Sequence, residues 1–341
     1  MNYQDKINIY VPQEIGNMLD KDATMFEIVK KDKQTINRNK FLSSLILGYY
    51  NSYVAECQKI YSQIVSELED SGIPSDKTHA IASGILNKIF LPEVPSRKGK
   101  HPSKLSLKPT KQTEGLIANI MSELPSDQFI SQYFCRLLLS YCEKPFSIRE
   151  QIVFRDNYEF LQSACTQRKP ISFFTIWNPI VNHTVIPYQL AVGYEEFYNY
   201  LLRAEINPST GKQEAKSYRL NRITNIQYKQ RSNQISDEVM EYLQRMLQYG
   251  PQYSINDSHE SCVKLSDAGQ RNYSRIYYGR PQEDRVENGP DGHYYYYKCS
   301  KDQIYLYFRR FEADDAEIIS PPSLRKRMSE FHLQAYKQYD R

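Results

Sequence analysis

The sequence has no long hydrophobic run. Its most apolar stretch, residues 41–54, is interrupted by serine, glycine and asparagine and is shorter than the roughly 20 residues that a membrane-spanning helix needs. The first six residues are polar, and no apolar segment of the kind found in secretion signals follows them. We therefore expect a cytoplasmic protein with no membrane partner.

Metal-binding and disulfide patterns are also absent. The six cysteines include no C-x-x-C pair, and none lies at zinc-finger spacing from a histidine. In a chain of 341 residues we expect them to be reduced, mostly buried thiols. The sequence thus predicts no metal and no bound cofactor.

The chain lacks the common catalytic signatures. It has no G-x-x-x-x-G-K-[ST] loop, no G-x-G-x-x-G turn, no H-E-x-x-H helix and no G-x-S-x-G turn. His183 together with arginines could support acid–base chemistry in a metal-free ribonuclease, but the sequence places no second base beside it. We expect a protein that is not an enzyme.

Tyrosine, by contrast, is abundant: 29 Tyr stand against 14 Phe and 1 Trp. Tyrosine combines an apolar ring with a polar tip, so it suits half-buried and ligand-binding surfaces. Drift of composition in an AT-rich genome would give the same excess. Hydrophobic residues make up 40% of the chain, which is enough for two or three packed domains.

Positive charge is concentrated along the chain. The net charge is +4, yet segments 92–113, 146–231 and 321–341 carry +5, +4 and +3, so the remainder carries −8. Clustered basic side chains favour a polyanionic partner more than the total charge does. Segment 92–113 has four prolines and no helical period, so we expect a basic linker there, either simply solvated or in contact with phosphate.

The N-terminus begins with an alternating segment. Residues 6–11 alternate polar and apolar side chains, which predicts a half-buried strand with Lys6, Asn8 and Tyr10 facing outward. Helices are expected after Pro12 and from about residue 37. Strand, helix, helix resembles the ribbon–helix–helix family, in which strands of two chains pair and outward side chains read nucleic acid in a groove. A small dimerisation ribbon with no nucleic-acid role is the alternative.

From residue 146 the pattern changes to short strands. Residues 150–154 are compatible with a strand, and Asp156 and Glu159 form the capping box of the next helix. Strand-like runs then follow at 171–176, 184–192, 197–206 and 216–229, and the last is expected to bend near residue 221 into two strands. Five short strands in about 60 residues suggest a small, strongly bent barrel.

Three stretches of this region resemble the WYL-domain family. They are His183-Thr-Val-Ile-Pro187-Tyr188, Phe197-Tyr-Asn-Tyr200-Leu201 and Tyr218-Arg219-Leu220-Asn221-Arg222-Ile223. The second centres on Trp-Tyr-Leu in the family, so Asn199 replaces the name-giving Trp, and His183 stands where the family usually has arginine. The resemblance implies a small, Sm-like β-barrel.

The remaining C-terminal region is predicted as an α/β extension. Ser236 suits the N-cap of a helix that ends at Gly250, and a hairpin is expected around residues 288–292. The final strand–Pro–Leu–Arg–helix pattern resembles the extension that accompanies many WYL domains and commonly serves dimerisation. We expect the tyrosines of 294–297 and the run 304–311 to lie on adjacent strands and to pack at a dimer interface.

The sequence therefore predicts an α+β protein with four parts. In chain order they are a ribbon–helix–helix-like segment (1–56), a helical region with the basic linker (57–145), a WYL-like β-barrel domain (146–231) and an α/β dimerisation extension (232–341). This order is similar to the WYL accessory proteins found beside the type VI-D CRISPR RNA-guided RNA nuclease. Those are implied to bind single-stranded RNA and to enhance the nuclease.

The barrel region combines basic and aromatic residues. Such a surface suits single-stranded nucleic acid, because arginines hold phosphates while rings stack on bases. We predict Arg219 and Arg222 as phosphate contacts, with the family resemblance behind both, and Arg203 as a basic lining residue. His183 and Tyr188 are further candidates.

Two aromatic positions leave their facing open. Tyr200 is a further candidate for stacking, with a core position as the alternative that we favour. Alternation along a strand puts Tyr198 and Tyr200 on one face and sends Tyr218 and Arg219 to opposite faces. The sequence does not decide which of the last two faces a ligand.

Two functions remain open at this level. The first is a homodimeric, non-catalytic single-stranded RNA-binding accessory protein of a CRISPR RNA-guided nuclease. The second is a WYL-family transcription regulator that binds DNA through its N-terminal ribbon and senses an effector through its barrel. A scaffold whose barrel packs against a protein partner is the third, purely structural alternative.

Overall fold

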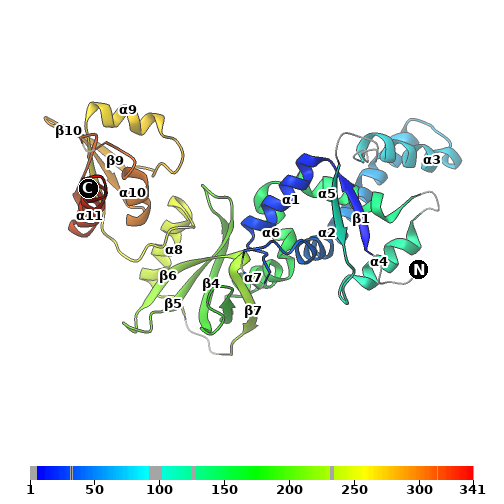
Figure 1. Ribbon diagram of the computed structural model, residues 1–341, viewed down its shortest axis with the longest axis horizontal. Coiled ribbons are helices and arrows are strands. Elements are labelled where there is room, and N and C mark those ends of the chain that lie inside the picture. Colours follow the sequence, from blue (N-terminus) through cyan, green and yellow to red (C-terminus); the bar gives the residue numbers. More distant parts are fainter. Residues whose placement is uncertain are drawn as a thin grey trace. The chain divides into compact units, whose positions relative to one another are not determined.

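The chain folds into two compact units, unit 1 (Met1–Asp156) and unit 2 (Asn157–Arg341). The computed structural model describes residues 6–30, 32, 34–91, 102–124, 128–230, 234–312 and 314–340. Helices and antiparallel sheets occur in both units, so the predicted α+β class is confirmed (Figure 1). In the described ranges, no helix combines the length and the apolar character needed to cross a membrane.

Unit 1 is mostly helical with one small sheet. Its elements are β1 (Ile7–Val11), α1 (Gln13–Met25), α2 (Arg38–Asp70), α3 (Ser75–Ile85), the π-helical segment η1 (Leu86–Phe90), β2 (Ser103–Leu107), α4 (Glu114–Glu123), α5 (Ile130–Cys142) and α6 (Phe146–Val153). The segment 150–154, expected as a strand, is instead the end of α6 and its C-cap, because Pro145 starts a helix there.

The sheet of unit 1 corrects the expected pairing of the N-terminal strand. β1 pairs antiparallel with β2 of the same chain, with Ile7 opposite Leu107 and Val11 opposite Ser103. The predicted alternation is confirmed, since Ile9 and Val11 are fully buried. The expected linker is therefore a strand at 103–107, where Ser-Lys-Leu-Ser-Leu alternates as β1 does; residues 92–101 lie outside the described part.

Long-range packing joins the helices of unit 1. Asp22 of α1 is buried and accepts hydrogen bonds from Arg149 Nε of α6 (2.7 Å) and from the Tyr141 hydroxyl of α5 (2.9 Å). α2 begins after Asn37, whose side chain accepts from the Lys40 N–H at 3.1 Å. This helix runs unbroken past residue 56, where the sequence suggested a boundary, because its apolar face stays inside one unit.

Unit 2 carries two sheets and the helices around them. Its elements are α7 (Arg155–Gln167, which begins in unit 1), β3 (Ile171–Thr175), β4 (His183–Val192), β5 (Asn199–Ile206), β6 (Gln213–Arg219), the 3-10 turn η2 (Leu220–Arg222), β7 (Ile223–Tyr228), α8 (Asp237–Tyr249), β8 (Ser261–Leu265), α9 (Asp267–Arg275), β9 (Arg285–Gly289), β10 (Gly292–Tyr297), α10 (Lys301–Phe308), β11 (Ala316–Ser320) and α11 (Pro322–Tyr339).

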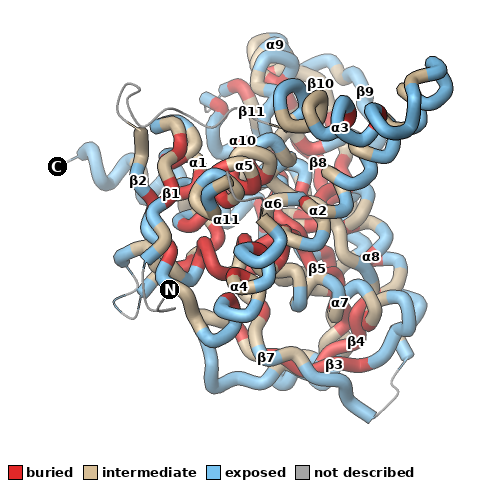
Figure 2. Tube along the Cα trace, turned by 90° about the vertical axis from the view of Figure 1, so that its right-hand side faces the viewer, coloured by how far each residue is buried: buried red, intermediate tan, exposed pale blue. Residues whose placement is uncertain are grey.

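The first sheet of unit 2 contains the five strands predicted for the barrel. Their order is β6-β5-β4-β3-β7, with every neighbouring pair antiparallel. The bend expected near residue 221 is confirmed, because η2 separates β6 from β7. The barrel is not closed in the described residues: β6 and β7 form the two edges of the sheet and do not pair. β3 and β5 are buried along most of their length (Figure 2).

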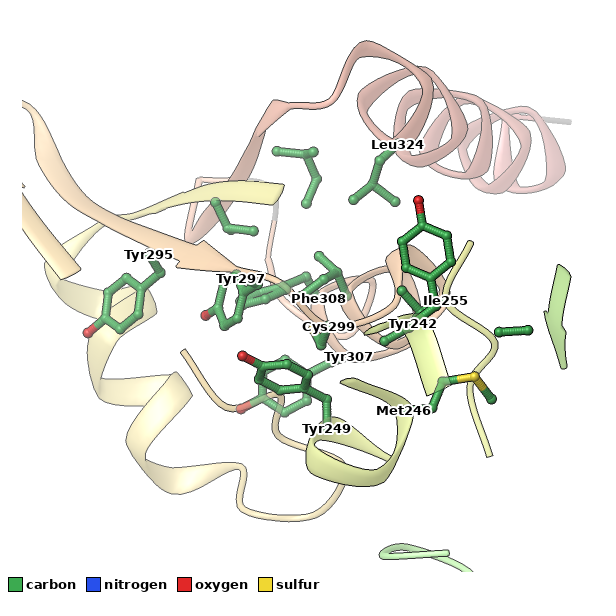
Figure 3. Close-up of a cluster of buried hydrophobic side chains, with 14 of the residues drawn as sticks. Tyr242, Met246, Tyr249, Ile255, Tyr295, Tyr297, Cys299, Tyr307, Phe308 and Leu324 are labelled. Atoms are coloured by element: carbon green, nitrogen blue, oxygen red, sulfur yellow. The ribbon is translucent and has the colours of Figure 1, made fainter. Parts of the chain in front are cut away.

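The second sheet corrects the expected tyrosine-rich interface. Its order is β11-β8-β10-β9. Tyr295 and Tyr297 of β10 and Tyr307 are buried in the core of their own chain (Figure 3). Tyr307 lies on helix α10 rather than on a strand, because Ser300 caps this segment by accepting from the Asp302 N–H at 3.2 Å. Tyr295, Tyr297 and Tyr307 therefore fill a core and are not available to a second copy, whereas Tyr294, Tyr296 and Tyr305 are half-buried.

Candidate functional site

A cavity of about 440 Å³ lies in unit 2 beside the bend between β6 and β7. We call it the arginine pocket. It brings together three of the predicted residues, Tyr200, Arg219 and Arg222, with Trp177 and Glu196. Its volume falls within the range of about 300–1,000 Å³ that is usual for small-ligand sites. The bend at η2 is what carries both arginines to one place.

Arg219 is held by several partners in this pocket. Its guanidinium pairs with the Glu196 carboxylate, and its Nε donates a hydrogen bond to the Tyr200 hydroxyl at 3.0 Å. The same group lies 4.2 Å from the centroid of the Tyr198 ring. Tyr198 and Tyr200 thus share one strand face, as the alternation predicts. A guanidinium fixed in this way presents its fork in a defined direction.

The electrostatics of the pocket follow from partial burial. Burial alone would lower the pKa of Arg219, but Tyr200 and Glu196 outweigh it, so the pKa is raised. Burial raises the pKa of Tyr200 to about 12. Burial also raises the pKa of Glu195, against the hydrogen bond that its carboxylate accepts from the Tyr253 hydroxyl at 3.1 Å. Arg219 therefore stays charged in any physiological solution.

The pocket also offers an exposed aromatic ring. Trp177 follows β3 and keeps 57% of its surface exposed, although it is the single Trp of the sequence. Tyr200, in contrast, is 5% exposed, so its ring belongs to the core and only its hydroxyl serves the pocket. Among the pocket's rings, Trp177 is therefore the one suited to stack on a ligand.

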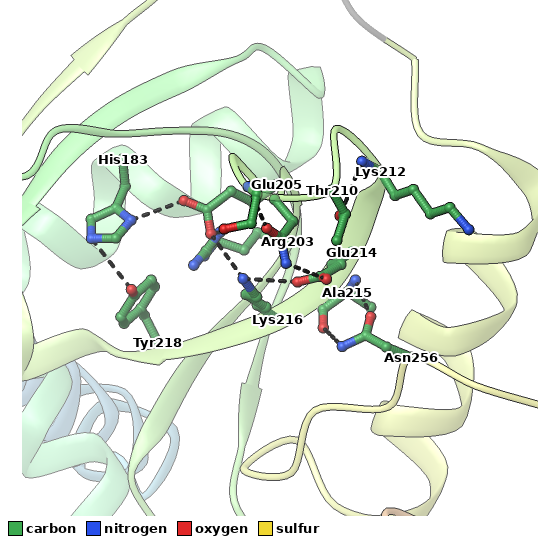
Figure 4. A network of polar contacts seen from close by, with 12 residues as sticks. His183, Arg203, Glu205, Thr210, Lys212, Glu214, Ala215, Lys216, Tyr218 and Asn256 are labelled. Carbon is green, nitrogen blue, oxygen red and sulfur yellow. Dashed lines mark hydrogen bonds and ion pairs between the residues drawn. The ribbon is translucent and has the colours of Figure 1, made fainter.

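A second polar network of the same sheet is centred on Glu205, whose carboxylate contacts His183, Arg203 and Lys216 (Figure 4). Its carboxylate lies 2.9 Å from Nδ1 of His183 and 2.6 Å from the Arg203 guanidinium. Because an ionised carboxylate only accepts, Nδ1 of His183 carries the proton toward it. Nε2 of the same ring lies 3.3 Å from the Tyr218 hydroxyl. Arg203 and His183 together hold the pKa of Glu205 below its ordinary value despite burial, which raises it.

Arg203 is not the basic lining residue that the sequence suggested. Its side chain has 0% exposure, and its guanidinium lies 4.3 Å from the centroid of the Tyr218 ring. Burial lowers its pKa. A side chain with no accessible surface cannot hold a phosphate in this conformation, so Arg203 neutralises Glu205 inside the fold. The apolar neighbours of residue 203 on β5 did not predict the burial of its side chain, because the same neighbours are compatible with a strand that lines a binding surface.

The remaining predicted residues are not among those that line the arginine pocket. Tyr188 of β4 is half-buried, with the Arg168 guanidinium 5.6 Å from its ring centroid. Lys6 and Asn8 are exposed and Tyr10 is half-buried, all in unit 1 on the outward side of β1. The Asn8 side chain accepts a hydrogen bond from the Ser106 hydroxyl of β2 at 3.0 Å.

His183 and Tyr218 also line a second cavity, of about 610 Å³. Tyr218 reaches both cavities, whereas Arg219 contacts the arginine pocket. Tyr218 thus contacts His183 and also borders the arginine pocket, whereas Arg219 pairs with Glu196 in that pocket.

Sequence reasoning missed the acidic side of the arginine pocket. Glu195 and Glu196 lie in the short connection between β4 and β5, and they pair with Tyr253 and Arg219. Two adjacent acids in a loop next to a basic strand were a visible signal. Tyr253, far along the chain, had none. In the described ranges, no group of three or more His, Cys, Asp or Glu residues is placed to hold a metal ion.

Comparison with known proteins identifies the fold. No family model matches the chain, and no curated protein matches it. The chain is similar to a solved structure described as "Crystal structure of a CRISPR Cas-related protein", with a TM-score of 0.67 and 18% identity over 98% of this chain and 94% of the other. At this identity the likeness shows a shared fold over nearly the whole length.

A second solved structure is much less similar. The proteasome accessory factor B/C (PafBC) of Arthrobacter aurescens aligns with a TM-score of 0.27 and 12% identity, over 99% of this chain and 50% of that one. A likeness this weak carries no argument.

Proposed function

We propose that this protein is a non-catalytic, single-stranded RNA-binding accessory protein of a CRISPR RNA-guided RNA nuclease, and that it binds the strand at the arginine pocket. The observation that carries the proposal is the placement of Arg219, Arg222 and the exposed ring of Trp177 around one cavity. The description of the similar structure as CRISPR Cas-related supports the cellular context.

Binding would proceed by exchange of one anion for another. In the free protein Glu196 occupies Arg219. A phosphate can replace this carboxylate, because its oxygens accept from a guanidinium fork in the same way. Tyr200 keeps Arg219 oriented during the exchange, and a base can stack on Trp177. Because the phosphate has to displace the Glu196 carboxylate, a single phosphate contact gives only a moderate affinity for RNA. Tight binding therefore needs contacts with several nucleotides.

The test is binding of unstructured RNA and of duplex DNA across a salt series, followed by fluorescence anisotropy. We expect the single strand to bind more tightly. The double variant Arg219→Ala with Arg222→Ala should weaken binding and flatten the slope of log K against log salt by roughly 1.4, at about 0.7 for each phosphate contact. Equal binding of the duplex, or an unchanged slope, would refute the site.

A matched control removes the same charge elsewhere in unit 2. Arg271 of α9 and Lys326 of α11 are both exposed. Their double replacement by Ala should leave the RNA affinity near that of the wild type. Enhancement of the nuclease is tested separately, by adding each variant to an RNA-guided RNA cleavage reaction and measuring its rate.

One observation favours a second function, regulation of transcription. β1 and β2 form a two-stranded ribbon whose outward side bears Lys6, Asn8, Tyr10 and Lys104. A two-stranded ribbon fits the major groove of DNA. Loss of binding to the protein's own promoter in the double variant Lys6→Ala with Asn8→Ala would support the regulatory function. An operator selection that enriches no motif counts against it.

We also propose a homodimer, now based on the last helix. Leu333, Tyr336 and Tyr339 of α11 are 51%, 63% and 85% exposed. These apolar side chains suit an interface with a second copy better than water. Light scattering should give twice the monomer mass, and Tyr336→Ser with Tyr339→Ser should lower it. A monomeric wild-type protein would contradict the proposal.

A further inference from the structure

Unit 1 contains a cavity that no part of the proposed function uses. It has a volume of about 620 Å³ and lies among α2, η1, α4 and α5. We call it the helical cavity. Its size suits a small organic ligand. It is bordered by the π-helical segment Leu86–Phe90. π-Helical turns are rare in proteins, and those that occur are often found at functional sites.

One wall of the helical cavity is aromatic. Tyr50 and Tyr53 of α2 and Tyr133 of α5 line it. The rings of Tyr53 and Tyr133 meet edge to face, with centroids 5.8 Å apart. Tyr53 is buried, whereas Tyr50 and Tyr133 are half-buried, so these two rings have free surface toward the cavity. Planar rings of this kind bind planar ligands.

The cavity also contains a cation without an anion. Arg136 of α5 donates from Nη1 to the side-chain oxygen of Asn87 at 3.0 Å. Asn87 belongs to η1 and is itself fixed by donating to the Ser83 carbonyl at 2.9 Å. Nε of Arg136 is buried and has no hydrogen-bond partner, and Arg136 forms no ion pair with a carboxylate in the part of the chain that the structure describes. Arg149, in the same unit, is neutralised by Asp22.

The lining includes acceptor and amide groups as well. Glu123, at the end of α4, lies near Tyr50 and Tyr133, and its charge adds to burial in raising the pKa of both hydroxyls. Gln58 and Gln132 add amide groups at the rim. The cavity therefore offers rings, one positive group, one negative group and neutral amides.

We propose that the helical cavity binds a nucleotide unit, that is, a phosphorylated nucleoside whose base has an exocyclic amino group. Arg136 holds the phosphate, because a half-buried guanidinium without a counterion gains most from an anion. Tyr50 and Tyr133 contact the ring. Glu123 accepts from the amino group, a contact typical of acidic side chains with cytosine or adenine. The unit can be a free mononucleotide or the end of a strand.

The experiment measures binding of the full-length protein to AMP, CMP, UMP, adenosine and inorganic phosphate by calorimetry. We expect AMP and CMP to bind at least about tenfold more tightly than adenosine or phosphate, because both ends of the ligand contribute. UMP should bind more weakly, since its base has no amino group. Absence of saturable binding by every mononucleotide would overturn the proposal.

Two variants separate binding from folding. Arg136→Gln should abolish the preference for AMP over adenosine, and Arg136→Lys should restore part of it. If Arg136→Gln unfolds the protein, Glu123→Gln at an exposed position should remove the preference for AMP and CMP over UMP at unchanged melting temperature. Unchanged preferences in folded variants of both residues would also overturn it.

Further measurements distinguish the source of the ligand and separate this proposal from the proposed function. A 5′-phosphorylated oligonucleotide that binds Arg136-dependently and more tightly than AMP assigns the strand end, and equal affinity assigns the free nucleotide; both support the site. Arg219→Ala should leave the Arg136-dependent component of AMP binding unchanged. The arginine pocket can therefore fail its own test while the helical cavity passes, and the reverse.

Discussion

At the scale of single residues, two arginines of unit 2 each pair with one carboxylate, and the exposure of the pair determines what the arginine can do. Glu196 neutralises Arg219 at an accessible pocket, whereas Glu205 neutralises Arg203 inside the fold. Accessible pairs contribute little to stability and can exchange partners. Buried pairs cannot exchange, because removing one partner leaves a charge without solvent. The first pair belongs to binding and the second to folding.

Glu196→Gln should therefore strengthen RNA binding at the arginine pocket. The amide keeps the size of the side chain but releases the ion pair, so a phosphate no longer competes with a carboxylate for Arg219. We expect an affinity increase of up to about tenfold, measured by anisotropy at fixed salt. An unchanged or weaker affinity would mean that Arg219 does not contact the strand.

Glu205→Gln should destabilise the protein by about 3–5 kcal/mol at neutral pH, because Arg203 then keeps an unpaired buried charge. The pKa of Glu205 is lowered in the folded state, so its contribution to stability is complete above the ordinary glutamate pKa of about 4.3 and is lost as the pH falls through the folded value. The difference between variant and wild type should shrink in acid.

Chemical denaturation at several pH values measures this effect. The control is Glu330→Gln, which removes an exposed ion pair with Lys326 on α11 and should cost less than about 1 kcal/mol. A constant difference between Glu205→Gln and the wild type down to about pH 3 would contradict the assigned ionisation.

At the scale of elements, close approach of helices decides what the sequence pattern leaves open. α2 and α6 touch at Gly48, where a Cβ would overlap the carbonyl oxygen of Ile152. Glycine weakens a helix by about 1 kcal/mol relative to alanine, so its presence within the buried part of α2 needs such a reason. The hydrophobic pattern of α2 alone does not predict that α6 packs against it at Gly48.

Gly48→Ala should destabilise unit 1 by about 1–3 kcal/mol, because the backbone of α6 has to shift. Gly84→Ala is the matched change: it lies in α3, where an added Cβ meets nothing within 4 Å. That substitution should be neutral or stabilising by up to about 1 kcal/mol. Melting temperatures of the two variants check the pair, and equal effects would refute the α2–α6 contact.

At the scale of the whole molecule, two units carry separate cores. The core of unit 2 includes a cluster from α8 through α11, which contains Tyr297 and Phe308, and the buried Asp22 pair lies inside unit 1. Units with their own cores unfold as separate cooperative transitions unless their interface is large.

Calorimetry of the full chain should therefore resolve two unfolding transitions. Gly48→Ala should lower one of them and Glu205→Gln the other, and the double variant should show both shifts unchanged, because effects at independent sites add. A single transition that both substitutions lower would show that the two units unfold together.

The sequence by itself determined the periodic features. The alternation in β1, the five strands of 171–228, the bend near Asn221, the cap at Ser236 and the hairpin around 288–292 all follow from side-chain spacing and turn chemistry, which are local. It also named Arg219 and Arg222 as phosphate contacts and Tyr200 as a candidate with a core position favoured. All three residues line one pocket, and the Tyr200 ring is buried.

Only the tertiary structure decided partners and burial. The pairing of β1 with β2, the core position of Tyr295 and Tyr297, the burial of Arg203 and the occupation of Arg219 by Glu196 all depend on residues far away along the chain. The position of Arg136, which forms no ion pair within the described part of the chain, is decided in the same way. A spacing rule sees a residue's neighbours in sequence, but solvent exposure and charge pairing are set by neighbours in space.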